Sequence, residues 1–117
     1  VFLFDFDSTL VDFETLELLA ELSLAGLPDA ADRRERIARL TDAAMSGEID
    51  FGEALRQRLA LLPLAAEHIR QAAAQAVGRL TPSVDRNRAF FRDHAERIAI
   101  VSGGFHEVIA PVAEALG

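Results

Sequence analysis

VFLFDFDSTL, at residues 1–10, joins a Phe-rich apolar run to a group of acidic and hydroxyl side chains. Apolar residues occupy both alternating faces of residues 1–7, which is typical of a strand buried on both sides in a parallel sheet. RIAIV, at residues 97–101, has the same character and leads into a second polar turn, SGG at residues 102–104. We therefore predict two parallel, neighbouring strands that each end in a polar loop.

Helical patterns fill most of the sequence between these two strands. Apolar periodicity with Gly or Pro stops predicts helices over residues 14–26, 29–46, 51–62, 65–79, 81–96 and 105–116. Strands separated by helices indicate an α/β protein with a parallel sheet. The all-helical block from Glu14 to about Leu80 is too long for a simple crossover. It predicts a helical cap of residues 14–79, inserted into a core of residues 1–13 and 80–117.

The composition is that of one soluble globular domain, with 117 residues, 50% hydrophobic and 26% charged. There is no Cys, which excludes disulfides, thiolate metal sites and a Cys nucleophile. The net charge is −7 and all 12 basic residues are Arg, which argues against nucleic acid as a partner. No apolar run approaches the roughly 20 residues that span a bilayer. We expect a cytoplasmic protein that acts on a small molecule.

The loop after the first predicted strand concentrates acidic residues. Asp5 and Asp7 are two positions apart, so in an extended chain both side chains project to one face. Two clustered carboxylates repel unless a cation or a shared proton relieves them, and magnesium prefers such oxygen ligands. A carboxylate can also act as a nucleophile that forms an aspartyl-phosphate, while its neighbour transfers protons. The same spacing also fits a solvated acidic turn without chemistry.

The loop after the second predicted strand has the composition of an anion-binding turn. Ser102 offers a hydroxyl donor, and Gly103 and Gly104 let the backbone approach an anion closely. The helix that follows adds free N–H groups and a positive dipole end. Alone, this turn is equally typical of an ordinary strand-to-helix connection. Because both loops lie at the carboxyl ends of parallel strands, together they favour a site for a magnesium-bound phosphate.

These residues resemble the signatures of the haloacid dehalogenase superfamily of phosphohydrolases. Residues 5–9, DFDST, match its DxDx(T/V) motif, and Ser102 matches its Ser or Thr after a later strand. Four stretches are similar, in order and spacing, to those of members that act on L-phosphoserine: FDFDSTLVDFE, AMSGEIDFGEALRQRLALL, LTPSV and IVSGGF. The resemblance implies a partial Rossmann-like parallel sheet with an inserted helical cap. It also implies a magnesium-dependent phosphatase that hydrolyses L-phosphoserine through an aspartyl-phosphate, as in serine biosynthesis.

The resemblance implies a role for each matched position. Asp5 matches the nucleophile, which also binds magnesium, and Asp7 matches the general acid–base, whose backbone carbonyl binds the same ion. Glu14 matches the acid that receives the substrate ammonium, and Arg58 matches the arginine that pairs with the substrate carboxylate. Met45, Gly47 and Phe51 match residues that line the pocket from the cap. Ser102 and Gly103 match the phosphate donors, and Gly104 completes the phosphate-binding turn.

Two further signatures of the superfamily, a Lys and a second acidic cluster, have no counterpart here, since the sequence has no Lys and nothing like GDxxxD after Ser102. The sequence also begins on an apolar run without Met and ends at Gly117 just after a helical pattern. We expect a piece of a longer enzyme, inactive alone because its charge neutralisation is incomplete. Two alternatives stay open: action on a different phosphomonoester or transfer to another alcohol, and a truncated, non-catalytic binding module.

Overall fold

Strands β1 (Phe2–Phe4) and β2 (Ile98–Ile100) pair side by side in a two-stranded parallel sheet, with Leu3 opposite Ala99. The computed structural model describes all residues from 1 to 117. Almost the whole chain therefore separates two strands that are neighbours in space. The predicted parallel pairing is confirmed, and no strand lies between them in the sequence.

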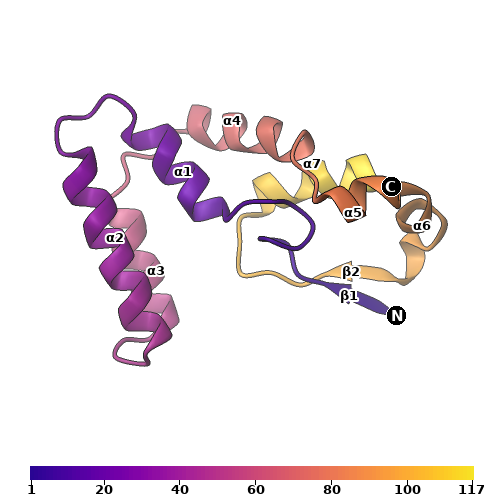
Figure 1. The fold of residues 1–117 in the computed structure, drawn as a ribbon, viewed down its shortest axis with the longest axis horizontal. Helices are drawn as coiled ribbons and strands as arrows, with labels where there is room; N and C mark the ends of the chain where they lie inside the picture. Colours follow the sequence, from indigo (N-terminus) through magenta and orange to yellow (C-terminus); the bar gives the residue numbers. More distant parts are fainter.

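Seven α-helices and a short 3₁₀ turn make up the rest of the ordered structure (Figure 1). In chain order they are α1 (Thr15–Leu24), α2 (Ala30–Met45), α3 (Phe51–Ala60), α4 (Ala66–Val77), α5 (Pro82–Arg86), α6 (Arg88–Asp93), η1 (Ala95–Arg97) and α7 (His106–Leu116). No helix is both long and apolar enough to cross a membrane.

Local hydrogen bonds explain two departures from the prediction. Each strand has three residues, fewer than predicted, and at the end of β1 the Phe6 N–H donates to the Asp5 carboxylate at 2.8 Å instead of extending the ladder. The helix predicted over residues 81–96 is divided into α5 and α6 at Asn87. The Asn87 side-chain amide donates to the Ser83 carbonyl at 2.7 Å, and its backbone leaves the helical region (φ −113°, ψ 28°). Asn side chains commonly interrupt helices in this way.

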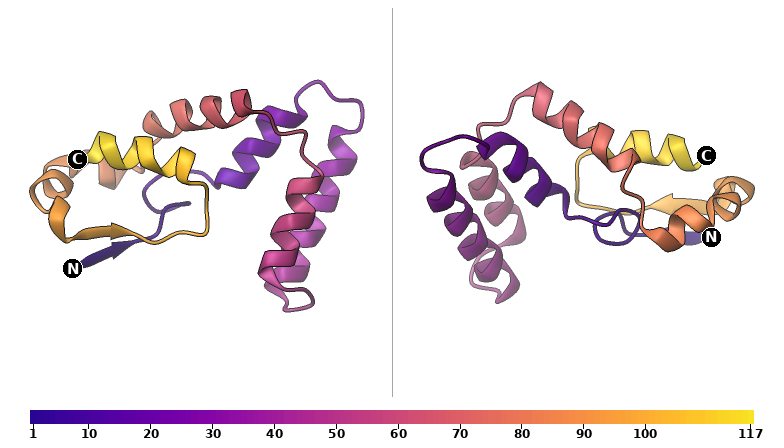
Figure 2. Two further views of the ribbon diagram at one scale, coloured as in Figure 1. Left: turned by 180° about the vertical axis from the view of Figure 1, so that it is seen from behind. Right: turned by 45° about the horizontal axis from the view of Figure 1, so that its top comes forward.

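The core lies between the sheet and the helices α1, α4 and α7, which lie on one side of the strands in Figures 1 and 2. Ala72 and Ala76 of α4 are fully buried, and their small side chains allow close packing against α1 and α7. Val108 and Val112 of α7 and Leu19 of α1 are also fully buried in the same cluster. The start of α1 is therefore fixed against the same core as the sheet.

Helices α2 and α3 form an antiparallel hairpin that projects away from this core (Figure 1). Asp50 caps α3, because its carboxylate accepts the N–H groups of Gly52 at 3.0 Å and Glu53 at 3.3 Å. Only Ala44 of α2 and Ala54 of α3 are buried. The hairpin is thus a distinct arm of the molecule, with little apolar burial of its own.

Candidate active site

The loop after β1 holds the two predicted catalytic carboxylates on an anchored turn. Phe6, between them, is fully buried, while Asp5 is exposed and Asp7 half-buried. The Ser8 N–H donates to the Phe13 carbonyl at 3.0 Å, and Ser8 has a left-handed backbone conformation with φ 56°. The turn therefore points its carboxylates away from the core at a fixed place.

The loop after β2 lies beside this acidic turn. The Val101 N–H donates to the Phe4 carbonyl at 2.9 Å, which holds the two strand ends together. The Gly104 N–H donates to the Ser102 hydroxyl oxygen at 3.0 Å and closes a tight turn. A Cβ on Gly104 would lie 3.1 Å from Ser102 Oγ and 3.7 Å from Asp7 Oδ2. Glycine at this position therefore avoids a tight contact with the Ser102 hydroxyl inside the turn, and the Asp7 carboxylate lies within ordinary contact distance of the same point.

Helix α7 starts at His106, directly after this turn, and its N-cap residue, Phe105, supplies no side-chain acceptor. The first N–H groups of a helix attract anions because they have no partners within the helix. The Ser-Gly-Gly turn and the start of α7 can therefore bind an anion at the carboxyl edge of the sheet.

One cavity of about 270 Å³ joins the two loops to the starts of α1 and α7 and to α3. It brings together seven of the ten predicted site residues: Asp5, Asp7, Glu14, Arg58, Ser102, Gly103 and Gly104. Its other lining residues are Thr15, Leu16, Leu55 and Phe105. Three carboxylates and one guanidinium thus share a small space, which suits a ligand or ion that carries positive charge as well as an anionic group.

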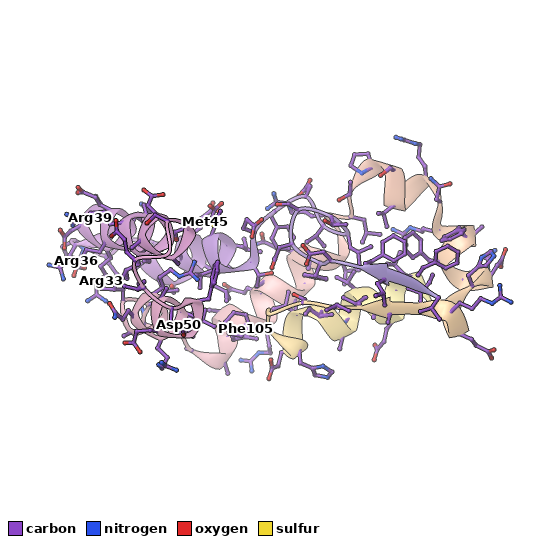
Figure 3. All side chains as sticks on the ribbon, turned by 90° about the horizontal axis from the view of Figure 1, so that it is seen from below. Arg33, Arg36, Arg39, Met45, Asp50 and Phe105 are labelled. Carbon is purple, nitrogen blue, oxygen red and sulfur yellow. The ribbon has the colours of Figure 1, made fainter.

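The remaining three predicted residues do not line this cavity. Met45 and Phe51 are 75% and 65% exposed, and Gly47 lies in the connection between α2 and α3, where its φ is +79°. Figure 3 shows Met45 and Asp50 on the hairpin, and Phe105, which precedes α7, between the hairpin and the rest of the molecule. A pocket-lining role for Met45, Gly47 and Phe51 stays a prediction.

Two hydrogen bonds connect the acidic turn to the start of α1. The Thr15 N–H donates to Asp7 Oδ1 at 2.7 Å, and the Thr15 hydroxyl donates to the same oxygen. The Ser8 hydroxyl donates to Glu14 Oε1 at 2.8 Å. Sequence reasoning missed Thr15 and Ser8 as parts of the site. Their only signal was position, since each directly follows a predicted site carboxylate.

Arg58 is the only basic residue that lines the cavity. It is half-buried on α3, where its Nη1 donates to the Thr41 hydroxyl oxygen of α2 at 3.2 Å and its Nε donates to the Ala54 carbonyl at 3.3 Å. These two contacts leave part of the guanidinium fork free to meet a carboxylate. The hairpin therefore contributes one positively charged group to a cavity whose other charged lining residues are acidic.

The structure contains no group of three or more His, Cys, Asp or Glu side chains placed to hold a metal ion. Asp5 and Asp7 still form a pair of oxygen donors at the strand end. Magnesium is commonly bound by one or two carboxylates together with water and substrate phosphate. The donor set therefore fits part of a magnesium site.

Residues 2–117 match the family model described as haloacid dehalogenase-like hydrolase. Phosphoserine phosphatase SerB2 of Mycobacterium tuberculosis is 39% identical over 114 residues, which are 97% of this chain and 25% of that protein. Other phosphoserine phosphatases match over 48% and 50% of their length. The chain thus spans between about a quarter and a half of the length of these relatives.

Two solved structures share the fold. A phosphoserine phosphohydrolase-like protein from Francisella tularensis subsp. tularensis SCHU S4 has a TM-score of 0.75 and 32% identity, over 98% of this chain and 52% of that one. A structure described as a phospho-aspartyl intermediate analogue of phosphoserine phosphatase has a TM-score of 0.64 and 33% identity, over 99% and 51%. The predicted fold class, a small parallel sheet of haloacid dehalogenase type with many helices, is confirmed.

Proposed function

The chain belongs to the haloacid dehalogenase-like hydrolase family, and we propose that it supplies the nucleophile, the acid–base and the substrate-binding groups of an enzyme that hydrolyses L-phosphoserine. The proposal rests on one cavity, in which the acidic turn and the Ser-Gly-Gly turn meet Glu14 and Arg58. The names of the similar proteins support the same reaction, a hydrolysis of a phosphoric monoester.

The proposed chemistry uses two carboxylates in sequence. An Asp5 oxygen attacks phosphorus and the bond from phosphorus to the serine oxygen breaks, while Asp7 gives its proton to that oxygen. Asp7 then takes a proton from water as the water attacks phosphorus. The bond from phosphorus to Asp5 breaks, which releases phosphate and restores both residues. The phospho-aspartyl analogue of a similar protein supports an intermediate of this kind.

The second loop would hold the phosphoryl group. The Ser102 hydroxyl, the Gly103 N–H and the start of α7 are donors at the same edge of the cavity, and Gly104 closes the turn through its own N–H bond to Ser102. Fixed donors of this kind stabilise the charge that develops on phosphoryl oxygens, since they need no reorganisation during the reaction. We propose this turn as the phosphate-binding part of the site.

Specificity for phosphoserine would come from two opposite charges. Glu14 offers a carboxylate to the substrate ammonium, and Arg58 offers a bidentate fork to the substrate carboxylate. Both line the cavity, one from the start of α1 and the other from α3. A zwitterionic amino-acid ester satisfies both groups, whereas a simple phosphomonoester leaves them unpaired.

Magnesium is the proposed cofactor, with the Asp5 carboxylate and the Asp7 backbone carbonyl as its ligands in this chain. When bound, it would neutralise phosphoryl charge and orient the phosphate. A Lys and a second acidic cluster, which the family uses for the same purpose, are absent from these 117 residues. We propose that the relatives carry this Lys and this acidic cluster in the part of their sequence that these 117 residues do not match. We expect residues 1–117 alone to be inactive.

The division into a core of residues 1–13 and 80–117 and a cap of residues 14–79 is likewise a proposal. Its support is limited to the α2–α3 hairpin, which packs mainly on itself and carries Arg58 to the cavity, whereas α1 and α4 of the same stretch pack with α7 of the core. In this arrangement the cap would set the choice of substrate and the core would perform the chemistry. A cytoplasmic place in serine biosynthesis accords with such a substrate.

The test measures phosphate release by the full-length protein in magnesium, with L-phosphoserine, phosphoethanolamine and p-nitrophenyl phosphate as substrates. We expect kcat/KM for phosphoserine to exceed that for phosphoethanolamine, which lacks the carboxylate, by about 30-fold or more. Beryllium fluoride, which mimics the acyl-phosphate, should bond Asp5 in a crystal structure.

Equal kcat/KM values would reduce the assignment to a general phosphomonoesterase. A beryllium bond to another residue would remove Asp5 as the nucleophile. If the full-length protein released no phosphate from any of the three, the non-catalytic binding module would be the better description.

A further inference from the structure

We infer that Thr15, to which no role has been assigned above, is a positioning residue for the reaction. Its hydroxyl fixes the Asp7 carboxylate so that one oxygen is held by α1 and the other faces the phosphate-binding turn. The inference rests on the proposed function, since it concerns the carboxylate proposed there as the acid–base.

The hydrogen bonds of Asp7 are strongly asymmetric. Both Thr15 donors, the backbone N–H at 2.7 Å and the side-chain hydroxyl, meet Asp7 Oδ1. No hydrogen bond of the chain reaches Asp7 Oδ2, and that oxygen lies 3.7 Å from where a Cβ on Gly104 would stand. The carboxylate is therefore oriented with Oδ2 towards the turn that would hold the substrate phosphate.

Burial makes this orientation firm. Thr15 is 2% exposed and packs at the edge of the core, so water does not compete for its hydroxyl. Two donors on one oxygen also resist rotation of the carboxylate about its last torsion, which is otherwise broad. An acid–base must lie within hydrogen-bond reach of the leaving oxygen, so its orientation contributes to the rate.

Helix capping alone does not account for the contact. The N-cap residue of α1 is Glu14, whose side chain does not cap the helix, and Asp7 accepts the first N–H from a loop eight residues earlier. One backbone donor would satisfy that capping function. The hydroxyl is an additional donor to the same oxygen, and its removal would leave the cap in place.

A further hydrogen bond, between Ser8 and Glu14, strengthens the attachment of the acidic turn to the start of α1. The Ser8 hydroxyl donates to Glu14, so residues 7 and 8 are bonded to residues 15 and 14 in reverse order. Ser8 also has φ 56°, a conformation that costs energy for a residue with a Cβ. Such conformations persist where the surroundings determine them and are frequent at functional sites. The acidic turn is therefore held to α1 on both sides of Asp7.

The test compares Thr15→Val with Thr15→Ser in the full-length protein. Val keeps the shape and the backbone N–H but lacks the hydroxyl, whereas Ser keeps both donors. The two substrates are phosphoserine, whose alkoxide leaving group needs a proton, and p-nitrophenyl phosphate, whose phenolate needs little protonation. kcat/KM reports the steps up to departure of the leaving group, so it isolates the acid role of Asp7.

For Thr15→Val we expect kcat/KM to fall about 10- to 100-fold on phosphoserine and less than about threefold on p-nitrophenyl phosphate. The loss should be in kcat rather than in KM. Thr15→Ser should stay within about threefold of the unmodified protein on both substrates. Thr81→Val is the matched control, because the Thr81 hydroxyl lies outside the cavity and is buried without a hydrogen-bond partner. This variant should leave kcat/KM unchanged on both substrates.

Four outcomes decide the matter. A full-length protein that is inactive on both substrates contradicts the proposed function, not the role of Thr15 specifically. An active protein in which Thr15→Val loses equally on both substrates, or loses nothing, overturns the positioning role. If kcat/KM on phosphoserine fell as far in Thr15→Ser as in Thr15→Val, loss of the hydroxyl would be excluded as the cause of the fall. If Thr15→Val does not fold by circular dichroism, Thr15→Ala provides the same comparison without a branched side chain.

Discussion

Helix α1 buries six of its ten residues, whereas α2 buries one of 16 and α3 one of ten. The first helix packs with α4 and α7 into the core beneath the strand ends, and its first residue holds Asp7. The hairpin packs mainly on itself and presents Arg58. The groups proposed for chemistry therefore rest on a buried scaffold, and the group proposed for recognition rests on a thinly packed arm. Substitutions in the two regions should differ in what they damage.

The largest effect should follow from Asp5→Asn in the full-length protein. The two side chains are nearly isosteric and Asp5 is exposed, so the free energy of unfolding should change by less than about 0.5 kcal/mol. Loss of the nucleophile should lower kcat by about 10⁴-fold or more. Phosphate release checks the predicted loss of kcat, and thermal unfolding of the same sample checks the predicted stability. A large loss of stability would mean that the acidic turn supports the fold as well as the chemistry.

Arg58→Ala should damage recognition and spare the fold. We expect KM for phosphoserine to rise with a cost of about 2–5 kcal/mol, because the substrate carboxylate loses the only basic partner that lines the cavity. p-Nitrophenyl phosphate, which has no carboxylate, should be almost unaffected. Arg58→Lys should recover only part of the loss, since an ammonium cannot form two parallel hydrogen bonds.

Equal losses on the two substrates, with the variant still folded by circular dichroism, would remove Arg58 from recognition. The hairpin would then have no demonstrated part in substrate choice, and the contrast between the two regions would rest on packing alone.

A matched pair of leucines measures the packing difference directly. Leu19 of α1 is fully buried, and Leu19→Ala should lower the free energy of unfolding by about 2–4 kcal/mol. Leu40 of α2 is only half-buried, so the same substitution there should cost about 1 kcal/mol. Urea unfolding of both variants tests the difference, and similar costs would show that the hairpin is as firmly packed as α1.

The smallest effect should follow from Arg56→Ala on the outer face of α3. The Arg56 guanidinium donates to the exposed Glu53 carboxylate at 2.7 Å and, with Gln57, lowers the pKa of Glu53 below its ordinary value of 4.5. A lowered folded-state pKa stabilises the protein above the ordinary value, and this contribution disappears as the pH falls through the lowered one. Removal of Arg56 should raise the pKa of Glu53 in an NMR titration and leave the unfolding temperature unchanged at pH 7, because exposed pairs contribute little.

The architecture was predictable where local patterns carry the information. The apolar runs at residues 1–7 and 97–101 predicted the parallel pairing, and the polar residues after each strand predicted where the loops meet. Parallel strands place their carboxyl ends at one edge, so topology accounts for the meeting of Asp5 and Asp7 with the turn at residues 102–104 in one cavity. Glu14 and Arg58 were predicted from the family resemblance, and they line the same cavity. Helix interruption at Asn87 depends on a side-chain contact with Ser83 that hydrophobic periodicity does not report.

The missed parts of the site depend on tertiary geometry. The contact between Thr15 and Asp7 exists because the chain turns back at Ser8, in a backbone conformation that no local signal predicts for serine. Met45 and Phe51 belong to a family motif, but their distance from the cavity is set by how the hairpin sits on the core. Motif spacing along the chain contains no information on that placement.

The left-handed serine also bears on how this turn can change by mutation. Glycine at position 8 would relieve strain of about 1–2 kcal/mol, but it would add about 0.5–1 kcal/mol of chain freedom to the unfolded state. On these two terms glycine would leave folding stability unchanged or raise it by up to about 1.5 kcal/mol, so selection for stability alone gives no reason to keep serine. A protein with Ser8→Gly would lose the hydroxyl that donates a hydrogen bond to Glu14. A drift from serine to glycine here would thus mark relaxed selection on the reaction while the protein still folds normally.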